Sequence, residues 1–184
     1  MIEAISAKYP QMQNVNYSFS SVHIDVANPL SDEIIKWGRE HISDDDIFVS
    51  QTEPTFGRED EIHITILYGL HSNKPDQVEA LFKKERPIQV RLGRVEIFTN
   101  PAKFDVVVIN VISEDLERLN KKLATTVPYT ERYGDYQPHL TIAYVKKGKG
   151  WKHKNLELWA GKKISTDHVV FSSKSGFKKR IDFC

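Results

Sequence analysis

Residues 136–145 have the sequence YQPHLTIAYV, which reads as a β-strand entered from a proline. Because successive side chains of a strand point to opposite faces, His139 and Thr141 are expected to point the same way. Ala143 should lie on this face too, where its small side chain leaves room for a ligand. Tyr144, an odd number of residues after Thr141, is expected on the other face, in the core.

The same arrangement occurs once earlier, in residues 62–69, with the sequence IHITILYG. Here His63 and Thr65 should share one face, and Tyr68 should lie on the opposite, core face. A single His-x-Thr triplet is more often an ordinary feature of a half-buried strand. Two copies in apolar strands of the same kind favour a functional role instead. They predict a fold that brings the two strands face to face.

The composition is that of an ordinary globular domain. The chain has 184 residues, of which 40% are hydrophobic and 28% charged, enough for one domain with its own core. The formal net charge of +1 gives no overall attraction to nucleic acid, so any phosphate binding must be local. The single cysteine, Cys184, rules out a disulfide within one chain and fits a reducing compartment. We see neither a membrane-spanning run nor a secretion signal, and we expect a cytoplasmic protein without a membrane partner.

Periodicity and turn residues divide the chain into strands and helices. Residues 1–16 are expected to form a loosely held lead-in, and residues 17–184 a single domain. Helices are expected to begin at Ser31 and Ser113, both as N-caps, and at Pro75 as a first helical residue. The other expected elements are a short helix at 156–159, strands at 17–27, 62–69, 88–99, 104–112 and 138–145, and a closing hairpin of 164–171 and 177–183.

The order of elements is similar around the two motifs. The first is followed by helix, strand, strand, and the second by short helix, strand, strand. Only the His-x-Thr strand itself is repeated as sequence. The pattern predicts an α+β fold of two pseudo-symmetric lobes, with antiparallel sheets forming a central cleft and helices outside.

Two histidines and two threonines on facing strands suit the chemistry of a phosphodiester. One histidine can take a proton from the attacking oxygen and the other can give one to the leaving oxygen. A threonine hydroxyl beside each can hold a non-bridging oxygen. The sequence has no paired cysteines, no His-Glu-x-x-His and no Gly-rich phosphate loop, so we predict no metal site and no cofactor.

The two motifs resemble those of the two-histidine (2H) phosphoesterase superfamily, which includes 2′–5′ RNA ligase-like proteins and cyclic nucleotide phosphodiesterases. The resemblance is carried by residues 63–65 and 138–141 in their apolar strands and covers roughly residues 17–183. Longer strings are similar to a bacteriophage-associated branch related to anti-CBASS proteins, which cleave the cyclic oligonucleotide messengers of bacterial immunity. These strings are residues 57–63, 67–71, 143–150 and 170–174. Ile62 stands where that branch often has a proline.

The resemblance implies a bilobal phosphodiesterase that needs no metal. His63 and His139 would be catalytic, and Thr65 and Thr141 would bind phosphate. The expected partner is a nucleotide or oligonucleotide, with no stable protein partner. The first-choice substrate is a cyclic oligonucleotide, cleaved for immune evasion in the host cytoplasm if the protein is phage-encoded. The alternatives are an RNA 2′,3′-cyclic phosphate phosphodiesterase or 2′-5′ RNA end-processing enzyme, a non-catalytic nucleotide-binding module, and a virion-associated structural module.

Five further residues are candidates for substrate binding. Aromatic side chains on the first strand and in loops beside the second motif could stack on a base, with core packing as the alternative. A lysine of the basic loop after the second motif could hold a phosphate, with plain solvent exposure as the alternative. The candidates are Tyr17, Phe19, Tyr136, Lys147 and Trp151.

Overall fold

One eight-stranded antiparallel sheet carries the fold, in the strand order β6-β3-β4-β5-β2-β1-β7-β8. The computed structural model describes residues 19–50, 56–101, 103–131 and 134–183. Tyr17 and the lead-in expected at residues 1–16 lie outside these ranges. The strands are β1 (Ser20–Asp25), β2 (His63–Leu70), β3 (Ile88–Thr99), β4 (Phe104–Ile112), β5 (His139–Lys146), β6 (Lys163–Thr166), β7 (His168–Ser172) and β8 (Lys178–Asp182). The helices are α2 (Leu30–His41), α3 (Asp76–Phe82) and α4 (Glu114–Thr126), with 3-10 turns η2 (Asp44–Asp46) and η3 (Trp151–His153).

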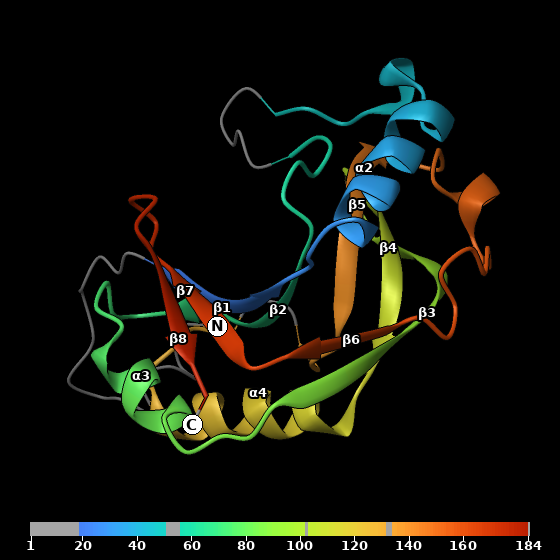
Figure 1. The fold of residues 1–184 in the computed structure, drawn as a ribbon. Coiled ribbons are helices and arrows are strands. Elements are labelled where there is room, and N and C mark those ends of the chain that lie inside the picture. The colour runs from blue at the N-terminus through green and yellow to red at the C-terminus, as the bar shows by residue number, and fades with distance from the viewer. Residues whose placement is uncertain (1–18, 51–55, 102, 132–133, 184) are drawn as a thin grey trace.

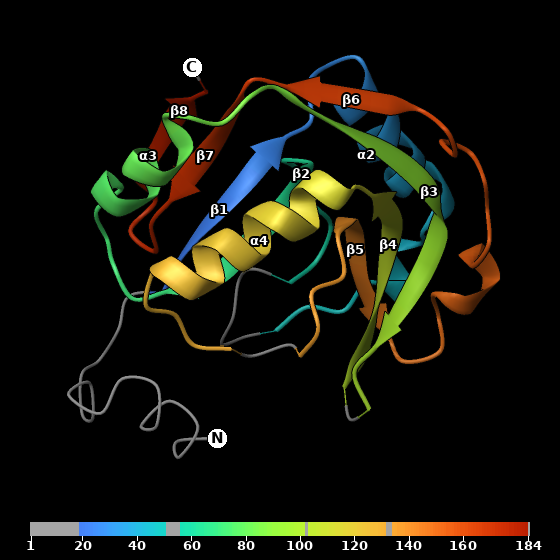
Figure 2. The same cartoon turned by 90° about the horizontal axis from the view of Figure 1, so that it is seen from below.

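The sheet is strongly curled, as Figures 1 and 2 show. Strand β6 forms one edge, whereas β7 lies next to the other edge, yet only Asp167 separates the two strands along the chain. The sheet must therefore bend round like a half-barrel to bring its ends together. The expected closing hairpin is present as the antiparallel pair β7–β8. Its first strand is shorter than expected, because residues 163–166 form β6, which pairs with β3 at the opposite edge of the sheet.

The predicted two-lobed α+β fold is confirmed, with both lobes forming parts of this one sheet. Strands β6, β3, β4 and β5 make one half, and β2, β1, β7 and β8 make the other. The halves meet where β2 pairs with β5, at Ile64 and Leu140. The two His-x-Thr strands are therefore direct neighbours at the centre of the sheet.

Each half is covered by a helix that follows a strand of the opposite half. Helix α2 comes after β1 but contacts β5, and α4 comes after β4 but contacts β2. Figure 2 shows α4 crossing the sheet near β2. At Gly38 of α2, an added Cβ would lie 2.9 Å from Cγ2 of Ile142, so the close approach of α2 to β5 requires the absence of a side chain.

Local sequence explains the start of α4 but not that of α2. Ser113 accepts a hydrogen bond from the Leu116 amide, as expected of an N-cap, and the apolar stripe of α4 is fully buried. Ser31 is not an N-cap: the N-cap is Pro29, two residues earlier, and Ser31 is buried within the first turn of α2. The short helix expected at 156–159 is absent, and the helical turn lies earlier, at η3.

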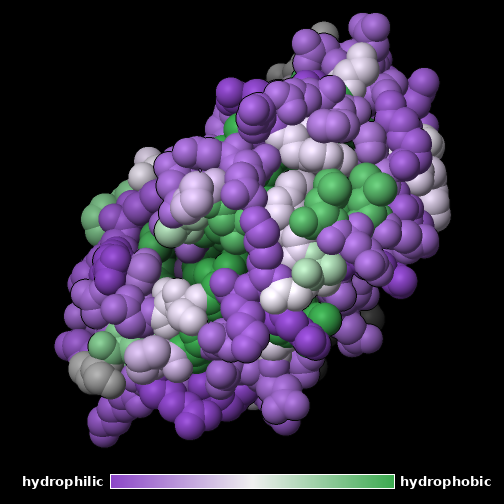
Figure 3. All heavy atoms as spheres, turned by 45° about the vertical axis from the view of Figure 1, so that its right-hand side comes forward, coloured by the Kyte–Doolittle hydropathy of each residue, from purple (hydrophilic) through white to green (hydrophobic). Residues whose placement is uncertain are grey.

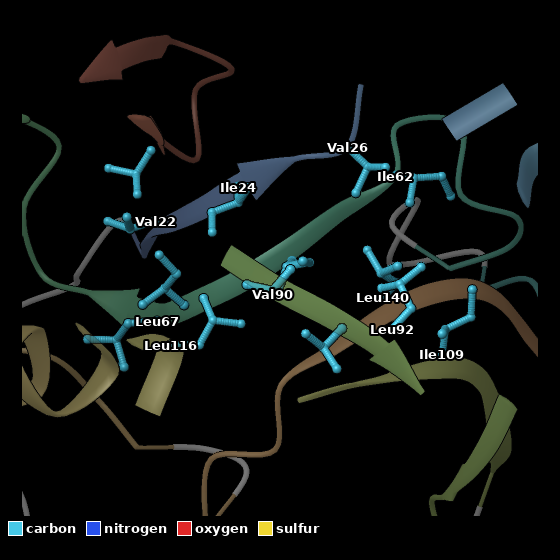
Figure 4. Packing of buried hydrophobic residues seen from close by; sticks show 14 of the residues in the cluster. Val22, Ile24, Val26, Ile62, Leu67, Val90, Leu92, Ile109, Leu116 and Leu140 are labelled. Carbon is cyan, nitrogen blue, oxygen red and sulfur yellow. The ribbon is translucent and has the colours of Figure 1, made fainter. Parts of the chain in front are cut away.

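The core is one continuous cluster that spans both halves of the sheet. Figure 4 shows Val22 of β1, Leu67 of β2, Val90 of β3 and Leu116 of α4 within it. The face in Figure 3 is mostly hydrophilic, with apolar atoms gathered in a hollow and on one raised patch. None of the helices in the described ranges has the length and apolar character needed to cross a membrane.

Candidate active site

The two His-x-Thr motifs lie opposite each other across the β2–β5 pair. Ile64 and Leu140 are partners in this antiparallel register, and both are fully buried. Extending the register by one residue in each direction places His63 opposite Thr141 and Thr65 opposite His139. Because side chains alternate, these four groups share the face that points away from the core. All four are half-buried. The two motif strands thus lie together as expected, but as neighbours in one sheet and not as strands that face each other.

Both histidine rings are held in the same way. Nδ1 of His63 lies 2.7 Å from the Glu61 carbonyl oxygen, and Nδ1 of His139 lies 2.6 Å from that of Gln137. A carbonyl only accepts hydrogen bonds, so Nδ1 carries the proton in each neutral ring. This leaves Nε2 of each ring as the atom that can exchange a proton with a ligand. No sequence pattern marks this tether, since every residue has a carbonyl.

The environment of His139 favours its neutral form. Burial lowers the pKa of His139, the positive charge of His63 lowers it further, and the Gln137 carbonyl acts in the opposite sense. The ring of Phe98 meets the His139 ring edge-on, with centroids 4.8 Å apart. His139 pairs with Asn110 of β4, along the edge of β5 that does not contact β2. A neutral imidazole in this position is suited to accept a proton.

A third histidine, His23, lies beside His63, and no motif in the sequence indicated a role for it. In the β1–β2 register His23 pairs with Thr65 and Asp25 pairs with His63, so both lie on the face of the motifs. The His23 and His63 rings are 5.0 Å apart, and Nε2 of His23 is 3.1 Å from the Asp25 carboxylate. Burial, followed by the charge of His63, lowers the pKa of His23 to about 4, although Asp25 opposes the shift.

Each motif strand contains one extra residue directly after its threonine. Opposite β1, Leu67 pairs with Val22 and Thr65 with His23, which leaves Ile66 as a bulge. Ser21 and His23 lie on the same face of β1. Ser21 pairs with Tyr68, and His23 pairs with Thr65. Tyr68 therefore lies on the His-Thr face, where 38% of it is exposed, and not in the core as expected.

Strand β5 has the same bulge, with Ile142 as the extra residue. Thr141 pairs with Val108 and Tyr144 with Val106, so Tyr144 also lies on the His-Thr face. Ala143 pairs with the intervening residue of β4, faces the core and is fully buried. The expectation that Ala143 leaves room for a ligand is therefore wrong, as is the expected core position of Tyr144.

Two of the other candidates lie next to this site. The half-buried ring of Phe19 is 6.2 Å from that of Tyr68. The Tyr136 hydroxyl donates to the Thr65 carbonyl oxygen at 2.9 Å, its ring packs against the core, and burial raises its pKa. Tyr136 thus supports the backbone of the first motif from behind. Tyr17 lies outside the described residues.

The remaining two candidates lie beyond the far end of β5. Lys147 lies eight positions after His139 along the chain, about 26 Å at a rise of 3.3 Å per residue. Lys147 donates to the Asn100 carbonyl oxygen at 2.8 Å and lies 3.1 Å from the fully buried carboxylate of Asp105. Trp151, 49% exposed, begins η3 and has the Lys154 ammonium 4.9 Å above its ring. The structure does not bring either residue to the histidines.

Within the described ranges, one set of side chains has the spacing of metal ligands: Asp167, His168 and Asp182. It lies at the β7–β8 end of the sheet, and Arg180 already donates to both of its carboxylates. None of the His-x-Thr residues belongs to it.

Comparison with known proteins gives one family match and several structures of similar fold. A family model described as the 2′-5′ RNA ligase superfamily matches residues 46–160, which include both motifs. Comparison with curated protein sequences gave no match. Among solved structures, apo LigT of E. coli is similar with a TM-score of 0.63 and 14% identity, over 92% of this chain and 99% of that chain. TT0787 of Thermus thermophilus is similar with a TM-score of 0.57 and 13% identity, over 89% and 95%. At these identities the structural likeness shows the fold alone.

Proposed function

The chain belongs to the 2′-5′ RNA ligase superfamily, and from this membership we propose that it is a metal-independent phosphodiesterase acting on nucleotides. One observation carries the proposal above all. Two histidines on paired strands have Nδ1 tethered to a backbone carbonyl in the same way, which leaves two Nε2 atoms on one face. A phosphodiester between them would have a proton acceptor on one side and a proton donor on the other.

In the proposed reaction, one Nε2 removes the proton of an attacking hydroxyl or water as the new P–O bond forms. The other Nε2 gives its proton to the leaving oxygen as the old P–O bond breaks. Thr65 and Thr141 donate hydrogen bonds to the non-bridging oxygens and stabilise their charge. A substrate with a neighbouring ribose hydroxyl would yield a cyclic phosphate, and a 2′,3′-cyclic phosphate would be opened by water.

We propose a cyclic oligonucleotide messenger as the substrate, on the resemblance to phage anti-CBASS proteins. For a phage-encoded enzyme the place of action is the host cytoplasm. Binding of a nucleotide is also supported by LigT, which has been crystallised in complex with 3′-AMP; that structure has a TM-score of 0.57 and 14% identity to this chain. Phe19 and Tyr68, at the edge of the His-Thr face, offer aromatic rings for a base.

Cleavage assays with a panel of substrates test this function. The panel holds cyclic dinucleotides, cyclic trinucleotides, 2′–5′ and 3′–5′ dinucleotides, and RNA ending in a 2′,3′-cyclic phosphate, with products separated by chromatography. We expect cleavage of the cyclic oligonucleotides at an unchanged rate in excess EDTA. Cleavage of the RNA end alone would favour the alternative substrate. Tight binding with the ligand recovered intact would favour a non-catalytic module, and a rate that EDTA abolishes would contradict the proposed chemistry.

A further inference from the structure

Three consecutive acids precede the first motif, and only one of them lacks a partner among the residues that the structure describes. Asp60 accepts a hydrogen bond from Arg39 at 3.0 Å, and Glu61 accepts one from Lys178. The half-buried Glu59 carboxylate has neither a hydrogen bond nor an ion pair with any residue in the described ranges. A carboxylate that is partly removed from water without a partner costs free energy, so its position calls for a reason.

The backbone at Glu59 is fixed along the edge of β5. The Tyr144 amide donates to the Gly57 carbonyl at 2.7 Å, and the Glu59 amide donates to the Ile142 carbonyl at 3.0 Å. Between these bonds, Arg58 pairs with Ala143. Residues 57–59 thus hydrogen-bond to the same edge of β5 that pairs with β2, further along β5 than the Ile64–Leu140 pair.

The direction of the Glu59 side chain follows from that of Arg58. The Arg58 guanidinium donates to the carbonyls of Gly38 and Ile42 in and after α2, at 2.7 Å and 2.6 Å. Arg58 therefore points to the helix-covered face, as Ala143 does. Neighbouring side chains of an extended segment point to opposite faces, so Glu59 points to the face of His139 and Thr141.

On that face Glu59 is within electrostatic reach of His63. Burial raises the pKa of the Glu59 carboxyl, and the positive charge of His63 lowers it. The neighbouring charges of Asp60 and Glu61 raise it further.

Among the described residues, other charged and titratable groups lie near His63 on β1, β5 and β8 and in the segment before β2. His23, with its pKa near 4, is neutral at pH 7, and Asp25 accepts its hydrogen bond. Lys178 of β8 pairs with Glu61 and so offsets its charge. The set comprises His23 and Asp25 of β1, Glu59 and Glu61 before β2, His139 of β5, and Lys178 of β8.

The two catalytic candidates thus differ in their surroundings. His63 has the Glu59 carboxylate on its own face. For His139, burial lowers the pKa, and among the described residues the groups that act on its charge are the Gln137 carbonyl and His63, with no carboxylate.

We propose that Glu59 is a positioning residue that stabilises the His63 imidazolium and thereby makes His63 the acid of the reaction. The proposal rests on the phosphodiesterase function above. His139 Nε2 takes the proton of the attacking O–H as the new O–P bond forms. The bond from phosphorus to the leaving oxygen breaks, and that oxygen takes the Nε2 proton of His63. The step ends with His139 protonated and His63 neutral, and proton exchange with water restores both.

Titration of the histidine rings by NMR tests the link between Glu59 and His63 without any substrate. The full chain is compared with E59Q, with E59D, which keeps the charge, and with D60N as the matched control. We expect the midpoint of the His63 ring titration to lie at lower pH in E59Q than in the wild type. It should stay near the starting value in E59D and D60N. An unchanged midpoint in well-folded E59Q would overturn the proposal.

The pH dependence of kcat/KM tests the assigned role. The alkaline limb reports loss of the proton from the acid, so in E59Q it should move to lower pH by the same amount, while the acidic limb stays in place. Movement of the acidic limb instead would overturn the assignment of His63 as acid. If the wild-type chain cleaves no substrate of the panel, the phosphodiesterase function fails, and the ring titration still decides whether Glu59 acts on His63.

Discussion

Ile66 and Ile142 occupy the same position in two copies of one β-bulge, each directly after the threonine of a His-x-Thr motif. The pseudo-symmetry of the fold thus extends to an irregularity of the backbone. Each bulge sends the next residue into the core and turns the following tyrosine onto the face of the histidines. Tyr68 and Tyr144 therefore flank the candidate active site, one on each strand.

Tyr68 should bind a nucleoside of the substrate. Replacing Tyr68 with alanine should raise KM about 5- to 150-fold, because stacking of a base on an aromatic ring contributes about 1 to 3 kcal/mol. The change in kcat should be small, since the ring is not part of the proton transfer. Steady-state kinetics on the best substrate of the panel measure both values.

Replacing Tyr68 with phenylalanine is the matched control, since it keeps the ring and removes only the hydroxyl. It should leave KM within about twofold of the wild type. A Y68A variant with unchanged KM would show that no base stacks there.

Much of the fold and the centre of the site could be predicted from the sequence. The paired motifs, the long strands β3 and β4 and the cap at Ser113 all follow from local rules that no distant contact overrides. Alternation along β2 and β5 failed after Thr65 and Thr141, because a bulge depends on the register with a neighbouring strand. Tyr68, Tyr144 and Ala143 were misplaced for this one reason.

The other differences between the predicted and the observed structure also have physical causes. The run 164–171 looks like one strand, but a bend at Asp167 divides it between the two ends of the sheet. Lys147 follows the second motif closely in sequence, yet it lies at the far end of an extended strand. His23 and Glu59 carry no motif, and only the register with β2 and the edge of β5 places them beside the site.

Lys147 should matter for stability and not for catalysis. Among the residues that the structure describes, replacing it with alanine leaves the fully buried carboxylate of Asp105 with only the Gly148 amide as donor. The free energy of unfolding should fall by about 1 to 3 kcal/mol in urea denaturation, with kcat/KM unchanged. Lys149→Ala is the control: it removes an exposed lysine 3.5 Å from Asp46 and should cost about 0.5 kcal/mol or less. Loss of activity in K147A at full stability would instead place Lys147 in the site.

Burial of His23 should make stability depend on pH. Its pKa falls from 6.5 to about 4 on folding, so below pH 6.5 the unfolded chain binds a proton that the folded chain does not. Stability from this group is complete above pH 6.5 and is lost as the pH falls toward 4. The difference corresponds to about 3 kcal/mol at most.

Urea denaturation at a series of pH values measures this effect. The wild-type free energy of unfolding should fall as the pH is lowered from 6.5 to 4. In H23N the part of this slope that His23 contributes should disappear. H41N, at an exposed position, is the matched control for the removal of a histidine. An H23N variant with the same pH dependence as the wild type would show that His23 titrates normally in the folded chain.

The most direct test of the central claim is the rate of phosphodiester cleavage by H63A and H139A, measured in EDTA on the substrate that the wild type cleaves fastest. Loss of either proton carrier should lower kcat by about 100- to 10,000-fold, while H41A keeps the wild-type rate and circular dichroism shows all variants folded. Wild-type activity in folded H63A or H139A would contradict the account, because the two tethered rings would then take no part in the chemistry.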